Sequence, residues 1–193
     1  GDSHYSANYA DVSILSFHPV KNFTTGEGGA ILTNDPLIAE KARLLRTHGI
    51  SKDPQTMTQD QGPWYYEMKY LGFNYRISDI QCALGLSQLK KLSRFINERR
   101  LIGQKYTEQL NGVPFLHLPS EQTHCRHTYH LYPLQVEFEK VGASRRQLFK
   151  RMEKVGVALQ VHYIPIHLQP YYQNRFGFTS GLCPIAEVFY RNE

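Results

Sequence analysis

The sequence is poor in cysteine and contains no long hydrophobic run. Its three cysteines, Cys82, Cys125 and Cys183, are widely spaced and odd in number, so they do not form the disulfide framework of a small secreted domain. Every apolar run is far shorter than the roughly 18 residues of a membrane-spanning helix. The opening GDSHYSANYAD also lacks the basic and apolar regions of a signal peptide. We therefore expect a cytoplasmic protein that does not enter the membrane.

The sequence carries only a modest excess of positive charge, with a net charge of +5 and an isoelectric point of about 9.1. This charge fits an enzyme for phosphorylated substrates and equally a nucleic-acid-binding protein. The basic stretch KKLSRFINERR is the candidate for nucleic-acid binding, although its other face is apolar at helical spacing, as in an ordinary solvent-exposed helix. A hydrophobic content of 41% can build a core, which excludes a disordered chain.

Two short strand patterns flank a lysine-containing loop in the first part of the chain. Residues 11–17 (DVSILSF) and 29–34 (GAILTN) have the apolar content and alternation of strands. A helix pattern follows, with Asp35 as the N-cap, a proline next to it, and Gly49 just past its end. Residues 50–72 are polar and interrupted by proline and glycine, as in a long functional loop.

The second part of the chain begins with a long helical pattern. Ser78 and Gln81 have the spacing of a capping box, and apolar residues at helical spacing continue, with or without a break, to Gly112. Beyond it the patterns predict a strand, a helix and a strand, at residues 129–138, 144–156 and 157–163, with Ser144 and Gln147 as the capping box of the helix.

These patterns predict two domains of α/β class. Residues 1–112 would form the end of a larger domain with its connecting helix, and residues 113–193 a smaller, incomplete domain, with the boundary near residues 112–128. The sequence ends in PIAEVFYRNE, inside a helical pattern without a terminating glycine. We therefore expect the chain to be a fragment of a longer protein.

The stretch SFHPVKNFTTGEGG places one lysine, Lys21, in a loop rich in glycine and threonine. Lysines in general are solvated surface charges, but a surface lysine has no need of such neighbours. Glycine allows a backbone to approach a ligand closely, so the composition favours a lysine that holds or attacks a ligand. The loop is not a nucleotide P-loop, because the G-x-x-x-x-G-K-[ST] pattern is absent.

This stretch resembles the DegT/StrS-type nucleotide-sugar aminotransferases, which use pyridoxal 5′-phosphate (PLP) on the fold-type I scaffold. The resemblance extends in order through LLRTHGI, LGFNYRISDIQCALGLSQL, HLYPL and VHYIPIH, and so covers most of the chain. Within the family, the motif with His18 directly after Phe17 is similar to that of the enzymes that aminate carbon 4 of a keto sugar. The resemblance implies amino transfer, usually from L-glutamate, to the 4-keto group of a UDP-linked 6-deoxy sugar.

The resemblance also assigns roles to five residues. Lys21 would bind PLP covalently and carry a proton during the reaction, and Ser16 would donate a hydrogen bond to the cofactor phosphate. Asn74 would reach across a homodimer to the phosphate bound by the partner subunit. Arg76 would lie near the sugar nucleotide, and His162 near the substrate. Without the resemblance, Ser16 would be interpreted as the end of a strand and His162 as a structural histidine. Asn74 and Arg76 would be interpreted as turn residues.

Two parts that the family needs are missing from this sequence. A PLP-dependent aminotransferase holds a carboxylate against the pyridine nitrogen, yet Asp2 and Asp11 are the only acidic residues before Lys21, and neither matches the family motif. The aromatic residue that stacks on the cofactor ring is missing too. We therefore expect both in an N-terminal half outside this chain, and we expect the isolated fragment to be inactive.

Two alternatives remain beside this interpretation. The chain could be a basic nucleic-acid-binding fragment, or a non-aminating PLP-binding member of the same family. Dehydratases of the family replace the lysine by histidine, and Lys21 argues against that activity. The segment THCRHTYH contains four residues of metal-binding type, but no second ligand pair follows at zinc-finger spacing. We expect no nucleic acid, membrane or metal as a partner.

Overall fold

The computed structural model describes residues 9–193, so Asp2 lies outside the described part of the chain. The chain divides into two units, Gly1–Phe95 and Ile96–Glu193, and each is described by itself. The domain boundary near residues 112–128 stays a prediction about the whole protein. No helix within residues 9–193 has both the length and the apolar character to cross a membrane.

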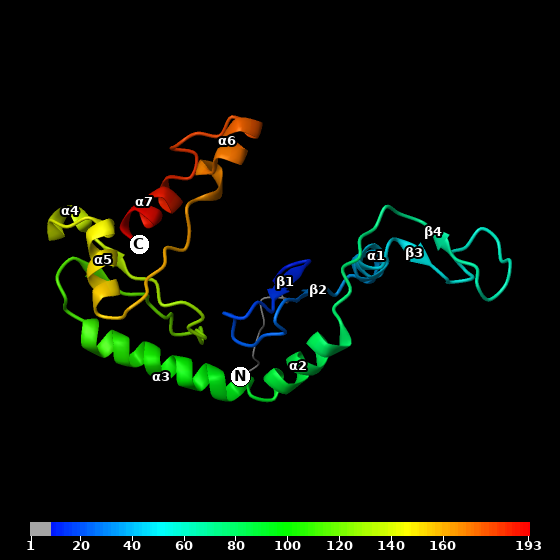
Figure 1. The fold of residues 1–193 in the computed structure, drawn as a ribbon, viewed down its shortest axis with the longest axis horizontal. Helices are drawn as coiled ribbons and strands as arrows, with labels where there is room; N and C mark the ends of the chain where they lie inside the picture. Colours follow the sequence, from blue (N-terminus) through cyan, green and yellow to red (C-terminus); the bar gives the residue numbers. More distant parts are fainter. Residues whose placement is uncertain (1–8) are drawn as a thin grey trace. The chain divides into compact units, whose positions relative to one another are not determined.

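The first unit consists of two small antiparallel sheets and two helices (Figure 1). Strand β1 pairs with β2 from Ser13 opposite Leu32 to Ser16 opposite Gly29, which confirms the two strands predicted around the lysine loop. The predicted loop 50–72 contains a short hairpin of β3 and β4. The elements are β1 (Ser13–Ser16), β2 (Gly29–Leu32), α1 (Pro36–Arg46), β3 (Ile50–Ser51), β4 (Glu67–Met68) and α2 (Asp79–Leu89).

Helix α1 begins and ends at the residues that the sequence indicated. The side chain of Asp35 accepts hydrogen bonds from the backbone N–H groups of Leu37 (2.8 Å) and Ile38 (3.3 Å), which satisfies two donors at the helix start. At Gly49 the backbone has φ +68°, and a Cβ there would lie 1.9 Å from the carbonyl oxygen of Tyr70. Only glycine permits both the turn and this close approach.

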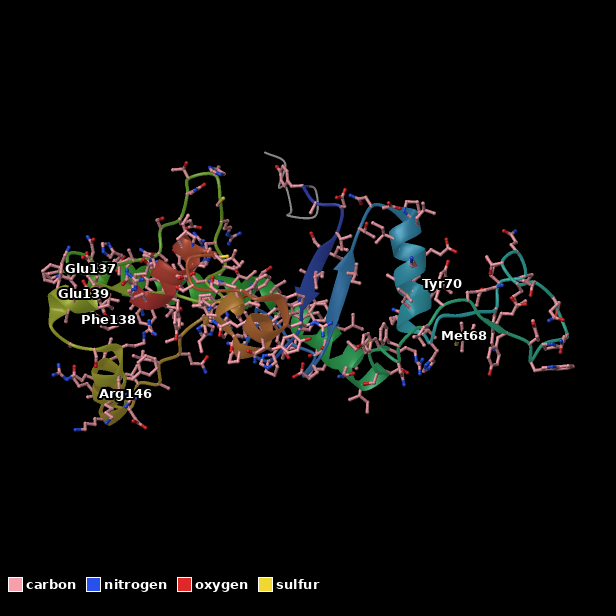
Figure 2. All side chains as sticks on the ribbon, turned by 90° about the horizontal axis from the view of Figure 1, so that it is seen from above. Met68, Tyr70, Glu137, Phe138, Glu139 and Arg146 are labelled. Carbon is pink, nitrogen blue, oxygen red and sulfur yellow. The ribbon has the colours of Figure 1, made fainter. Side chains whose placement is uncertain are left out.

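The segment after β4 returns to the end of α1. Phe73 N–H donates to Leu45 O at 2.7 Å and Tyr75 N–H donates to Arg46 O at 3.0 Å. Tyr70, labelled in Figure 2, lies beside α1, where Lys41 Nζ is 5.5 Å from the centre of its ring. The residues that lead into α2 are therefore held against the C-terminal end of α1.

Helix α2 is capped by Ser78 and Gln81 as predicted. The Ser78 hydroxyl accepts a hydrogen bond from Gln81 N–H (3.4 Å), and Gln81 Oε1 accepts one from Ser78 N–H (2.9 Å). The long predicted helix has a break at Lys90, after which α3 (Leu92–Leu110) begins and continues into the second unit.

The second unit contains the rest of α3, one small sheet and four further α-helices (Figure 1). The predicted helix at 144–156 is confirmed with its capping box. The predicted strand at 129–138 shortens to two residues, and the strand predicted at 157–163 is wrong, because that segment pairs with no other strand. The elements are β5 (Leu116–His117), β6 (Gln135–Val136), α4 (Phe138–Val141), α5 (Arg145–Lys154), the 3-10 helix η2 (Ile166–Leu168), α6 (Pro170–Phe176) and α7 (Pro184–Asn192).

The histidine-containing linker after β5 packs on α3 through aromatic residues. The ring of Tyr129 covers Gly103, where a Cβ would lie 3.0 to 3.1 Å from ring atoms, and the hydroxyls of Tyr132 and Thr107 are 2.7 Å apart. Arg100 holds Glu121 through two hydrogen bonds, of 2.6 and 3.1 Å. Among residues 9–193, no group of His, Cys, Asp and Glu side chains has the arrangement of a metal site.

Candidate functional site

Lys21 lies in the loop between β1 and β2, inside a frame of backbone hydrogen bonds. Phe17 N–H donates to Gly28 O at 2.9 Å, which closes the base of the loop. Thr25 N–H donates to Phe17 O at 3.0 Å, and Lys21 N–H donates to His18 O at 3.0 Å. The lysine is half-buried, and its backbone is fixed by a local turn rather than by a long strand.

The two threonines of the motif hold the loop together from inside. Thr24 Oγ1 donates to Phe17 O at 2.8 Å and accepts Gly26 N–H at 2.9 Å. Thr25, only 4% exposed, donates its hydroxyl to Glu27 O at 2.7 Å. Because a buried hydroxyl needs a partner, these bonds explain why threonine suits both positions.

Two glycines of the motif, Gly28 and Gly29, are required by close approach. A Cβ at Gly28 would lie 2.4 Å from Thr25 Oγ1, and a Cβ at Gly29 would lie 2.7 Å from Leu15 O. Real Cβ atoms do not come this close to such atoms, so a larger residue would open the loop. The TTGEGG segment is thus a compact backbone support for Lys21.

The loop also contacts the first turns of α2. Gln81 Nε2 donates to Glu27 O at 2.9 Å, across 54 residues of sequence. Further along the helix, a Cβ at Gly85 would lie 2.8 Å from Thr25 Cγ2, so the threonine methyl packs where the helix has no side chain. This contact fixes the lysine loop to the helix that follows the Asn74 segment.

Ser16 and Lys21 are brought together on one hairpin. Ser16 is the last residue of β1, opposite Gly29, and its exposed hydroxyl accepts a 3.4 Å hydrogen bond from His18 N–H. The ring of His18 lies 3.9 Å from a carboxylate oxygen of Glu27. A hydroxyl and an amine are therefore presented at opposite ends of the same turn.

Asn74 and Arg76 are exposed on the segment that leads into α2. Asn74 forms an isolated antiparallel bridge with Thr47 at the end of α1. Arg76 precedes the cap residue Ser78 by two positions, and the start of a helix is a place where anions are favoured. The roles predicted for these two residues stay predictions.

His162 belongs to the second unit. Its backbone N–H donates to Glu193 Oε2 at 2.8 Å, and its ring Nδ1 lies 4.0 Å from Glu193 Oε1. The side chain is 17% exposed. Glu193 thus holds the backbone of His162 in place. The role of His162 near a substrate stays a prediction.

A second polar cluster in the same unit surrounds Glu187, and sequence reasoning missed it. The carboxylate accepts hydrogen bonds from Ser180 Oγ (2.6 Å) and Gly181 N–H (2.7 Å), and His167 Nε2 lies 2.8 Å away. The hydrogen bond from Ser180 has the largest effect on the carboxylate and the contact with His167 the next largest, and the pKa of Glu187 is lowered to about 2. His167 is 6% exposed, so this pair holds η2 against α7.

Sequence reasoning also missed the second role of Gln81. The spacing from Ser78 identified a capping box, but a capping glutamine uses only its oxygen for the cap and leaves its NH₂ group to donate elsewhere. A glutamine, rather than a glutamate, at this position was the one available signal.

Residues 2–193 match the DegT/DnrJ/EryC1/StrS aminotransferase family. The UDP-4-amino-4,6-dideoxy-N-acetyl-beta-L-altrosamine transaminase of Campylobacter jejuni is 36% identical over 184 residues, which are 95% of this chain and 46% of that protein. Helicobacter pylori PseC, an aminotransferase involved in the biosynthesis of pseudoaminic acid, has a TM-score of 0.82 at 34% identity and covers 95% of this chain and 47% of its own.

A further similar structure is Spr1654 of Streptococcus pneumoniae, a candidate sugar aminotransferase in its PLP form, with a TM-score of 0.80, 31% identity, and coverage of 97% of this chain and 46% of that one. The chain thus spans about half the length of the relatives that it matches. The predicted α/β class of fold-type I is confirmed for this half, and aminotransferases of this type depend on PLP. The chain belongs to the DegT/DnrJ/EryC1/StrS aminotransferase family.

Proposed function

We propose that the whole protein is a PLP-dependent aminotransferase in which Lys21 is the lysine that binds the cofactor. The observation that carries this proposal is the loop around Lys21, where two threonines, two close-packed glycines and the start of α2 fix the backbone of one half-buried lysine. A solvent-exposed lysine needs none of these contacts. Membership of the aminotransferase family supports the same assignment.

The residues of the hairpin fit one side of PLP. Lys21 offers a primary amine for the aldehyde, and Ser16 offers an exposed hydroxyl for the phosphate. At Gly26 the loop has no side chain, and the space beside it is open, since a Cβ there would have no atom within 4 Å. Bound PLP supplies an electron sink for charge that develops on the substrate carbon. The carboxylate for the pyridine nitrogen and the stacking ring would come from outside this chain.

Lys21 has two tasks in this proposal. Its Nζ would hold the cofactor through the aldehyde group, and the same nitrogen would hold and move a proton at the carbon that gives or receives the amino group. Both tasks need Nζ to return to one place. The hydrogen-bonded turn from His18 to Lys21 supplies a fixed backbone for that return.

The substrate assignment rests on the relatives. A Campylobacter relative is a UDP-sugar transaminase, and the structural neighbour PseC is involved in pseudoaminic acid biosynthesis. We propose L-glutamate as the amino donor and the 4-keto group of a UDP-linked 6-deoxy sugar as the acceptor, as in a pseudaminic acid pathway. Arg76 would bind the sugar nucleotide through its permanent charge, and His162 would contact the substrate.

The first prediction tests the cofactor lysine in the whole protein. With PLP added, we expect an absorption band of the lysine-bound cofactor, and after borohydride reduction we expect peptide mapping to find the label on Lys21. K21A should give neither band nor label, while K105A, a change on an exposed face of α3, should give both. Label on another lysine would overturn the assignment, and salt-sensitive binding to arbitrary DNA without a band would favour the nucleic-acid alternative.

A further inference from the structure

The side-chain amide of Gln81 makes contacts in two directions. Its Oε1 accepts the Ser78 N–H and lies 2.9 Å from the Ser78 hydroxyl, which closes the cap of α2. Its Nε2 donates to Glu27 O at 2.9 Å, on the far side of the lysine loop. One planar amide therefore joins the start of a helix to the loop that carries Lys21.

The carbonyl oxygen of Glu27 is the point where the loop is held. It accepts Thr25 Oγ1 at 2.7 Å and Gln81 Nε2 at 2.9 Å, and these two bonds use both of its lone pairs. Thr25 is buried, and its methyl group packs at Gly85 of α2. A fully satisfied polar network of this kind restricts motion more than its separate bonds would.

From this geometry we propose that Gln81 is a positioning residue for Lys21. This inference rests on the proposed function, because it concerns the placing of the lysine nitrogen at the cofactor. The bond to Glu27 restricts the half of the loop that follows Lys21, and the hydrogen bond from Phe17 N–H to Gly28 O restricts the base of the loop. Loss of the Gln81 hydrogen bond would widen the range of positions that Lys21 Nζ occupies. The lysine would still be at the site.

The chain contains a matched control in α5. Gln147 forms the same capping box with Ser144, whose N–H donates to Gln147 Oε1 at 2.8 Å. Within residues 9–193, its side chain hydrogen-bonds with no residue other than Ser144. Glutamate can serve in a capping box as well as glutamine, so Q81E and Q147E both keep a cap. Only Q81E removes an NH₂ donor from a second segment and turns a carboxylate oxygen toward a carbonyl.

The experiment compares the whole wild-type protein with Q81E and Q147E by two measurements. In the absence of PLP, hydrogen exchange reports on the amides of residues 17–28, and we expect about tenfold faster exchange in Q81E and no change in Q147E, since one hydrogen bond is worth about this factor. With PLP, we expect kcat to fall about tenfold or more in Q81E with little change in KM for L-glutamate, because misplacing a reacting group raises the barrier.

The outcomes separate this inference from the proposed function. If wild-type Lys21 takes the borohydride label but Q81E leaves both loop exchange and kcat unchanged, Gln81 is only a helix cap and the inference is wrong. Equal effects of Q81E and Q147E would also overturn it, because they would reflect a general loss of helix stability. If wild-type Lys21 takes no label, the proposed function itself fails, and with it the positioning role.

Discussion

At the scale of single residues, Glu67 in the first unit is surrounded by a cation and several hydrogen-bond donors. Its carboxylate pairs with the Lys69 ammonium and accepts hydrogen bonds from Thr58 N–H (2.8 Å), Thr58 Oγ1 (2.6 Å) and Tyr65 OH (3.0 Å). Lys69 has the largest effect on this carboxylate and the Thr58 hydroxyl the next largest, and the pKa of Glu67 is lowered from 4.5 to about 2. These contacts close the loop between β3 and β4.

This lowered pKa predicts that the stability of the loop between β3 and β4 depends on pH. Because the folded pKa lies below the ordinary value, the stabilisation is complete above about pH 4.5 and is lost as the pH falls toward 2. The protection of the Thr58 amide against hydrogen exchange should therefore exceed that in E67Q at neutral pH. The difference between the two proteins should shrink between pH 4.5 and 2, and a midpoint near 4.5 in the wild type would contradict the assignment.

At the scale of elements, local signals in the sequence predicted the helices well. Asp35, Ser78 and Ser144 each cap the helix that they were expected to cap, because a cap depends on residues within one turn. The two strands that flank the lysine loop were predicted for the same reason, since their apolar patterns are local. The composition of the loop already favoured a lysine that holds a ligand, and the family resemblance indicated which cofactor that ligand is.

Contacts between distant segments could not be predicted in the same way. Residues 157–163 have the composition of a strand, but a strand exists only where a second one pairs with it, and none does so in the described part of the chain. The bond from Gln81 to Glu27 spans 54 residues, and no periodicity connects the two positions. The site is therefore predictable as a motif but not as a packed arrangement.

The contact between α2 and the lysine loop leads to a prediction for Gly85. Alanine is favoured over glycine in a helix by about 1 kcal/mol, but a Cβ at Gly85 would lie 2.8 Å from Thr25 Cγ2. Overpacking of this kind costs about 1 to 3 kcal/mol. We expect G85A to lower the free energy of unfolding by about 1 kcal/mol net, measured by urea denaturation of the whole protein.

The comparison for this change is G103A in α3. A Cβ there would lie 3.0 to 3.1 Å from the ring of Tyr129, a milder overlap, so the loss of stability should be smaller. G85A should also speed hydrogen exchange in residues 24–28, which G103A should leave unchanged. A gain in stability from G85A would show that helix propensity outweighs the contact with Thr25.

At the scale of the whole molecule, the chain exposes far more surface than its mass requires. Its accessible surface is 15117 Å², whereas two separate compact units of half its mass would together expose about 11,400 Å². Within the described residues no hydrophobic side chain is buried. This exposed apolar surface agrees with a chain that spans about half the length of its relatives.

Part of this exposed apolar surface surrounds Asn74. Tyr75 is 71% exposed and Leu71 is 84% exposed, and the stacked rings of Phe73 and Tyr75 lie on either side of the asparagine in sequence. In the homodimer that the family resemblance implies, this segment would meet the partner subunit, with Asn74 donating to the cofactor phosphate bound there. A hydrogen bond to a charged phosphate is worth about 1.5 to 3 kcal/mol.

The role of Asn74 therefore predicts complementation between two defective proteins. N74A should weaken PLP retention at least tenfold, whereas N111A, an exposed asparagine at the end of α3, should not. In a mixed dimer of N74A and K21A, one site combines Lys21 of the first subunit with Asn74 of the second. Mixing the two should restore borohydride labelling of Lys21 at one of the two sites of each mixed dimer, since the other site lacks both groups. If Asn74 acted within its own subunit, each site of the mixed dimer would lack one group, and mixing would restore nothing.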